Sequence, residues 1–261
     1  MDVEADRHAT GHILMELGFS VSRAGDEVHG EARVVPEMWA PGTSSLRTSI
    51  LATWVDHVAG LVAITVLAPR VPVTLELDVH VYGQAPADGS IHAVARLLKA
   101  GRTVVVCGVD VTDGDGEPVA IGTASFMVAP DPRAELPDSF SFDRTADPDL
   151  RLRQPFAERA GCRRRQPGVA VLPRSDDGLN AAGTINGGLI ALAVEEAALS
   201  LAPGATLSSM ALRYLRPVRT GPAVATADVR AGLGRVDVRD AGGDDRPAVT
   251  ATTRLSNVLV T

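Results

Sequence analysis

The fold of this chain is decided by two apolar runs, LRTSILATWVD at residues 46–56 and INGGLIALAVE at residues 185–195. Each run reads as a buried helix that contains an acid: Asp56 stands nine positions after Arg47, and Glu195 nine positions after Asn186. A carboxylate inside an apolar helix costs several kcal/mol unless it is paired or used in chemistry. Two such helices therefore predict two similar units with functional sites between them.

Sequence outside the helices repeats in the same order. Gly-Arg at 101–102 is echoed at 234–235, and VDVTD at 109–113 is echoed by VDVRD at 236–240. Such order favours a tandem duplication over chance similarity of two Ala/Val-rich segments, and 261 residues suit two domains of ordinary size. We expect an N-terminal domain at 1–129, a proline-rich linker at 130–149 and a C-terminal domain at 150–261.

Composition excludes several classes of function. The net charge is −7 and the only basic run is at 163–165, which argues against a nucleic-acid partner. The two cysteines and six histidines lack metal-ligand spacing, so we expect no metal and no cofactor. The longest strongly apolar stretch, 58–69, is too short to cross a bilayer, and the acidic start does not read as a signal peptide. We expect a soluble cytoplasmic protein without a membrane partner.

The pattern of predicted elements repeats as well. A helix at 46–67 precedes strands at 73–81, 91–98, 103–111 and 118–128, and a helix at 187–201 precedes strands at 208–215, 223–230, 235–239 and 248–255. A long apolar helix followed by an antiparallel meander, twice, predicts an α+β fold of two tandem hotdog domains. Each domain is a curved antiparallel sheet wrapped around its helix, and the two form an internal pseudo-dimer. A further homodimer stays open.

The segment NAAGTINGGL at 180–189, followed by Glu195, resembles the signature of hotdog acyl-CoA thioesterases of the phenylacetate-degradation type. That signature has Asn, then Gly, then His-Gly-Gly at the helix start, and an acid nine residues after the histidine. Here Asn186 replaces the histidine, and the first copy has Arg47-Thr48-Ser49 there. The resemblance implies a thioester hydrolase that converts an acyl-CoA to free acid and CoA, although an acyl carrier protein substrate stays open.

Antiparallel helices determine which residues meet. An acid nine residues along a helix lies roughly 13 Å from the helix start, so it can serve only the neighbouring helix. We therefore expect Asp56 to face the start of the second helix and Glu195 to face Thr48. The resulting composite site assigns catalysis to Asp56, Thr74, Asn180 and Gly187, and substrate binding to Asn186 and Gly188. Its twin around Glu195 and Thr48 is expected to be degraded.

Each assignment has a structural alternative. Asp56 could be a buried acid paired with His57 or an arginine, Asn180 a turn residue, and Gly187-Gly188 a site of close helix packing. The arginines at 213, 216 and 219 could bind CoA phosphates, although a solvated face is favoured. At the level of the whole protein, the alternatives are a non-catalytic acyl-CoA-binding or regulatory protein and, less favoured, a hydratase that uses His57 with Asp56.

Overall fold

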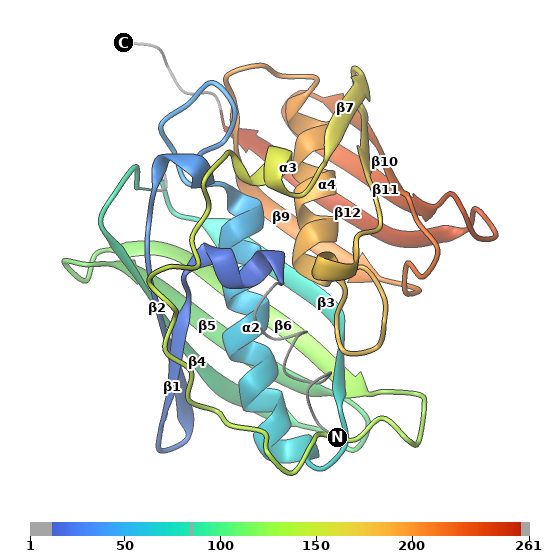
Figure 1. Cartoon of the computed structure of the whole chain (residues 1–261). Helices are drawn as coiled ribbons and strands as arrows, with labels where there is room; N and C mark the ends of the chain where they lie inside the picture. The colour runs from blue at the N-terminus through green and yellow to red at the C-terminus, as the bar shows by residue number, and fades with distance from the viewer. Residues whose placement is uncertain (1–11, 84–85, 257–261) are drawn as a thin grey trace.

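The computed structural model describes residues 12–83 and 86–256, which form one 12-stranded sheet around two central helices (Figure 1). The strand order is β1-β2-β4-β5-β6-β3-β9-β12-β11-β10-β8-β7, with antiparallel pairing throughout. The first six strands belong to one half of the chain and the last six to the other, in corresponding order. This is the predicted α+β arrangement of two hotdog units joined edge to edge.

The first half surrounds α2 (Thr48–Leu67). It opens with the 3-10 helix η1 (Ile13–Leu17), which ends at Gly18 in the left-handed conformation (φ 62°). A second short 3-10 helix, η2 (Pro36–Met38), precedes α2. The strands are β1 (Ser20–Ala24), β2 (Glu27–Arg33), β3 (Pro72–Val81), β4 (Ser90–Ala100), β5 (Val105–Asp113) and β6 (Pro118–Val128).

The second half surrounds α4 (Gly187–Leu199), which is shorter than α2 and ends two residues before the predicted position. Two short helices, α3 (Phe156–Arg159) and η3 (Asp176–Gly178), precede α4. The strands are β7 (Arg163–Gln166), β8 (Val169–Leu172), β9 (Thr206–Tyr214), β10 (Ala223–Arg230), β11 (Leu233–Asp240) and β12 (Pro247–Ser256).

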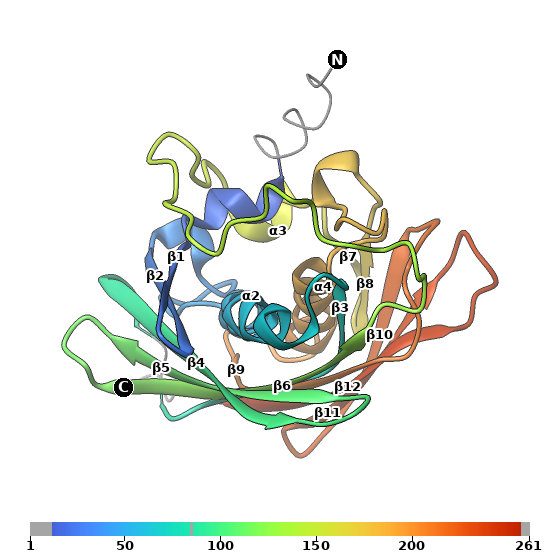
Figure 2. The same ribbon diagram turned by 90° about the horizontal axis from the view of Figure 1, so that it is seen from below.

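The sheet forms a trough that holds both helices, and η1, α3 and the chain around residues 130–149 cover the open side (Figure 2). This wrapping explains why α2 and α4 lack a polar face: nearly every side chain of α4 is buried. By length and composition, α2 could span a bilayer, although the prediction from the sequence rested only on the shorter apolar stretch 58–69. In this fold, however, 67% of the most apolar 18-residue segment of α2 is buried inside the protein. The sheet therefore accounts for the apolar character of α2.

The two halves meet where β3 pairs with β9, from Glu76↔Arg213 to His80↔Ser209. Arg213 crosses this junction and forms ion pairs with Glu76 (3.2 Å) and Asp78 (2.5 Å). Arg213 therefore joins the halves through carboxylates of the first half, while its side chain stays 38% exposed to solvent.

The central helices pack side by side and antiparallel, as predicted. Glu195, in the middle of α4, accepts a hydrogen bond from the Thr48 amide at the start of α2 (2.9 Å). At the opposite end of the contact, a Cβ added to Gly188 would lie 2.4 Å from Thr53 Oγ1. The start of α2 therefore lies beside Glu195 of α4, and the start of α4 lies beside the second turn of α2.

The short hairpin strands β1 and β7 were not predicted. β7 has the sequence RRRQ, and all four residues are exposed, so it carries no apolar alternation that could signal a strand. It is held by its pairing with β8 at the sheet edge. Residues 130–149 contain no helix or strand, but one isolated bridge joins Arg144 to Val21 of β1.

Candidate active site

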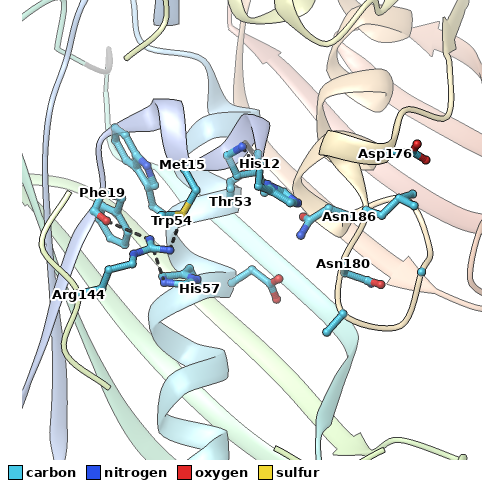
Figure 3. Close-up of a pocket in the computed structure, with 15 residues that line it drawn as sticks. His12, Met15, Phe19, Thr53, Trp54, His57, Arg144, Asp176, Asn180 and Asn186 are labelled. Carbon is cyan, nitrogen blue, oxygen red and sulfur yellow. Dashed lines mark hydrogen bonds between the residues drawn. The ribbon is translucent and has the colours of Figure 1, made fainter. Parts of the chain in front are cut away.

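A cavity of about 1050 Å³ lies between the two halves (Figure 3). Residues of η1 and α2 line it from the first half, and the loop before α4 lines it from the second. Figure 3 shows Asn180 and Asn186 across the cavity from His57 of α2. The lining is apolar at Met15, Phe19 and Trp54, and polar at Asp56, Asn180 and Asn186.

Asp56 and Thr74 meet at this cavity. The Thr74 hydroxyl on β3 donates a hydrogen bond to Asp56 Oδ1 (2.9 Å). Burial raises the pKa of Asp56 from 3.8 to about 6, while the hydrogen bond from Thr74 acts in the opposite direction. Near neutral pH, Asp56 is consequently an oriented carboxylate that is more basic than an ordinary aspartate.

Asn186 caps α4, where the signature has a histidine. Its side-chain Oδ1 accepts the Gly188 N–H (2.8 Å), so asparagine replaces histidine as a capping residue. Within the described residues, the neighbouring Gly187 N–H has no hydrogen-bond partner. An unpaired N–H at the positive end of a helix dipole can polarise a carbonyl oxygen.

Gly188 has the packing role that was the alternative to substrate binding. A Cβ at this position would collide with Thr53 Oγ1 of α2 at 2.4 Å, so glycine permits the helices to approach. Gly187 packs against Tyr214 of β9, and a Cβ added to Gly187 would lie 3.1 Å from the Tyr214 hydroxyl oxygen. The predicted pair therefore divides into a packing glycine and a glycine whose amide is unpaired.

Asn180 organises the loop before α4 and also lines the cavity. Its Oδ1 accepts hydrogen bonds from the Ala182 N–H (3.0 Å), the Thr184 N–H (3.2 Å) and the Thr184 hydroxyl (3.1 Å). These contacts fit the turn-residue alternative. They use only the carbonyl end of the side chain, and in the described chain its amide N–H groups have no partner.

Tyr214 belongs to the site and was not predicted. Its buried hydroxyl donates to the Gly187 carbonyl (3.1 Å), which ties the end of β9 to the first turn of α4. Burial raises the pKa of Tyr214 well above its ordinary value, and the negative charge of Asp56 adds to this effect. Tyr214 therefore remains a neutral donor beside Asp56. Its position at a strand end in a chain with only two tyrosines was the available signal.

The twin site contains a buried ion cluster. Glu195 is 0% exposed and receives hydrogen bonds at Oε1 from Thr48 N (2.9 Å) and Ser49 N (3.3 Å). Its Oε2 accepts from the Ser49 hydroxyl (2.7 Å) and from Arg47 Nη1 (3.1 Å). Every oxygen of Glu195 is therefore engaged within the fold.

Arg47 closes the twin site. Its guanidinium also donates to Glu196 Oε1 (2.7 Å), and Glu196 pairs in turn with Arg164 of β7 (2.7 Å). The Thr48 hydroxyl, meanwhile, donates to the Leu207 carbonyl (2.6 Å). The structure therefore places Glu195 and Thr48 together, as expected, but in a filled arrangement in which both carboxylate oxygens of Glu195 are bonded and only Arg47 Nε is left without a partner among these groups.

His57 does not pair with Asp56. Its Nε2 lies 3.4 Å from Arg144 Nη2, and its ring packs edge-on against Phe19. Burial lowers the pKa of His57 to about 3, and the positive charge of Arg144 contributes. His57 is therefore neutral near pH 7 and is turned toward a different part of the cavity wall from Asp56.

Comparisons with known proteins agree with this fold. Residues 49–120 match the family model of the Thioesterase superfamily. The chain is similar to the 12:0-ACP thioesterase from Umbellularia californica, with 15% identity, a TM-score of 0.65, and coverage of 90% of this chain and 99% of that one. An acyl-ACP thioesterase from Bacteroides thetaiotaomicron has 14% identity, a TM-score of 0.62, and coverage of 88% and 98%.

A conserved protein with a hot dog fold from Alicyclobacillus acidocaldarius matches with 17% identity and a TM-score of 0.60, covering 94% of this chain and 97% of that one. No match was found among curated proteins. At these identities the likeness establishes the fold, two hotdog units spanning the chain. The family model supports thioester hydrolysis as the class of reaction.

Proposed function

We propose that this protein is an acyl thioesterase with one working active site per chain, built from both halves around Asp56. The observation that carries the proposal is the Asp56–Thr74 pair at a cavity whose opposite side is the α4 start. A basic, oriented carboxylate can take a proton from water, or attack directly, while unpaired N–H groups receive the developing oxyanion.

Each residue then has a defined task in hydrolysis. Asp56 acts on water or on the thioester carbonyl, and Thr74 orients its carboxylate. The Gly187 N–H polarises the carbonyl oxygen, and Tyr214 holds the first turn of α4 through the Gly187 carbonyl. The free amide end of Asn180 supplies a further donor from the loop. The apolar residues Met15, Phe19 and Trp54 form a wall suited to the acyl chain.

The twin site shows a helix start whose backbone amides are already occupied by a carboxylate. There the carboxylate of Glu195 occupies the amides of Thr48 and Ser49, which correspond to Gly187 and Gly188 of α4. Aspartate is shorter than glutamate by one carbon–carbon bond, about 1.5 Å, and no hydrogen bond joins Asp56 to the described α4 start. The Gly187 N–H, which has no hydrogen-bond partner among the described residues, is thereby left for a substrate oxygen.

This contrast also weighs against the alternatives. A binding protein with two decayed sites does not require a basic carboxylate positioned by Thr74 beside an open cavity. A hydratase that uses His57 with Asp56 is disfavoured because His57 faces Arg144 and not Asp56, and because its pKa, lowered by burial to about 3, makes it a weak base. The leaving thiol is proposed to be CoA, as the signature of the second half suggests. Acyl carrier protein is the alternative thiol carrier, because two structurally similar proteins are described as ACP thioesterases.

The proposal is tested by thiol release from hexanoyl-CoA, octanoyl-CoA, dodecanoyl-CoA and the corresponding acyl carrier protein thioesters. We expect turnover of at least one thioester by the wild type and a loss of about 10²–10⁴-fold in kcat/KM with Asp56→Asn, since that is the usual contribution of a positioned base. Glu195→Gln is the matched control from the twin. Turnover by Asp56→Asn close to that of the wild type contradicts the proposal.

A further inference from the structure

Arg144 supplies a positive charge to the wall of the same cavity. It lies in the 130–149 segment, far in sequence from the other first-half residues that surround it. The backbone of Arg144 exchanges two hydrogen bonds with Val21 of β1, both 2.8 Å. Two residues later, the Ala146 N–H donates to Ser20 Oγ (2.9 Å). Arg144 is therefore held in a fixed place against the first half.

The Arg144 guanidinium has only neutral partners in the described part of the chain. Nη1 lies 2.8 Å from Met15 Sδ, and Nη2 donates to the Phe19 carbonyl (3.1 Å) and faces His57 Nε2 (3.4 Å), as Figure 3 shows. No described carboxylate forms an ion pair with it, and its buried Nε–H has no hydrogen-bond partner.

Two other arginines that are withdrawn from solvent are compensated by carboxylates, whereas Arg70, which lies outside this cavity, donates in the described chain to backbone carbonyls only. Arg47 pairs with Glu195 and Glu196, and Arg159 pairs with Glu16 (2.6 Å) and with Asp177. Arg144, by contrast, depresses the pKa of neighbouring His57 and has its own pKa lowered by burial. A partly buried cation in a cavity wall that lacks a carboxylate partner in the described chain, and whose Nε–H is unpaired there, favours an anion that enters with a ligand.

We propose that Arg144 is an anion-binding subsite for a carboxylate or phosphate carried by the acyl thioester. This inference rests on the proposed function and narrows its substrate class. A carboxylate at the far end of the acyl chain is the first source, since Arg144 lies beside the aromatic residues Phe19 and Trp54, which stack at 5.4 Å. The phosphates of the thiol carrier are the second source of the same chemistry.

Direct binding separates this inference from catalysis. Calorimetric titration with hexanedioate, hexanoate and free CoA is compared among wild type, Arg144→Gln, Arg144→Lys and the matched control Arg133→Gln, whose side chain lies in the same segment but is 87% exposed. We expect Arg144→Gln to weaken either hexanedioate or CoA by about 10- to 100-fold, the usual effect of a hydrogen bond to a charged group. Hexanoate binding should not change, and Arg144→Lys should retain part of the affinity.

Turnover then identifies the source of the anion. Arg144→Gln that loses kcat/KM for hexanedioyl-CoA but not hexanoyl-CoA supports an acyl carboxylate. A loss with both CoA esters but not with the phosphate-free N-acetylcysteamine ester of hexanoate supports a carrier phosphate. Unchanged binding of hexanedioate and CoA in a folded Arg144→Gln overturns the inference, as does an equal loss with every thioester. A wild type that binds hexanedioate through Arg144 without hydrolysing any ester would contradict the proposed function alone.

Discussion

Asp56→Asn should remove hydrolysis and make the protein more stable at pH 8. The pKa of Asp56 rises from 3.8 to about 6 on folding because burial penalises the ionised form. The folded state therefore binds a proton more tightly than the unfolded state does. Between pH 3.8 and about 6 the wild type loses stability as the pH rises, and above about pH 6 the cost of the buried charge is fully present.

The magnitude follows from the same interval. At about 1.4 kcal/mol for each pH unit, the distance between 3.8 and about 6 corresponds to about 3 kcal/mol. Asp56 is partly accessible from the cavity, and water there reduces the cost, so we expect about 1–3 kcal/mol. Asparagine keeps an oxygen that can accept from Thr74, so the substitution removes the charge and leaves this hydrogen bond in place.

The assay is denaturant unfolding of wild type and Asp56→Asn at intervals from pH 4.5 to pH 8. Groups other than residue 56 titrate alike in the two proteins, so the difference in unfolding free energy isolates this carboxyl. The advantage of Asp56→Asn should grow up to about pH 6–7 and then stay constant. A difference independent of pH would refute the raised pKa, and a wild type more stable than the variant at pH 8 would refute the buried, unpaired carboxylate.

Three further predictions concern the surroundings of Asp56 and its twin. Glu195→Gln should lower the unfolding free energy by about 2–4 kcal/mol, because Arg47 is then buried with Glu196 as its only carboxylate partner. The same variant should keep kcat/KM within about threefold of the wild type. A loss of turnover equal to that of Asp56→Asn would show that the twin site is active. In a pH–rate profile of the wild type, kcat/KM should fall about tenfold per pH unit below about pH 6. Thr74→Val should move this fall in kcat/KM to higher pH, because the Thr74 hydrogen bond lowers the pKa of Asp56. An unchanged profile would mean that Thr74 does not act on the catalytic carboxyl. Gly188→Ala should lower the unfolding free energy by about 1–3 kcal/mol, because the added Cβ clashes with Thr53. The double variant Gly188→Ala/Thr53→Ala should recover most of that stability in thermal unfolding. Strictly additive losses of stability would place the strain elsewhere.

The central parts of the site were predictable because they follow from helix geometry. The positions of Asp56 and Glu195 along apolar helices, combined with antiparallel packing, predict which helix start each acid faces. Glu195 does reach Thr48 as expected. Thr74 could be placed only through the family resemblance, and the structure brings its hydroxyl to Asp56. Whether these residues catalyse hydrolysis stays a prediction.

Residues outside the helices could not be placed in this way. Tyr214 reaches Gly187 from a strand end, and Arg144 reaches His57 from a segment whose prolines predicted only a linker. Their contacts depend on where irregular chain crosses a neighbouring element, and no periodicity in the sequence records such a crossing. Tertiary contacts of this kind are visible only once the fold is built.

The two helix starts show how small differences can give one cavity and one ion cluster. At the α2 start, Glu195 is long enough to reach the backbone amides, and Arg47 compensates its charge and fills the space in front of it. At the α4 start, Asp56 is shorter and Asn186 accepts from the Gly188 amide, so the Gly187 amide has no hydrogen-bond partner within the described residues. Arg47 offsets the free-energy cost of burying the Glu195 carboxylate, whereas no arginine in the described chain pairs with Asp56. A carboxylate with a raised pKa, oriented by Thr74 and without an ion-pair partner in the described chain, meets the requirement for a general base in thioester hydrolysis.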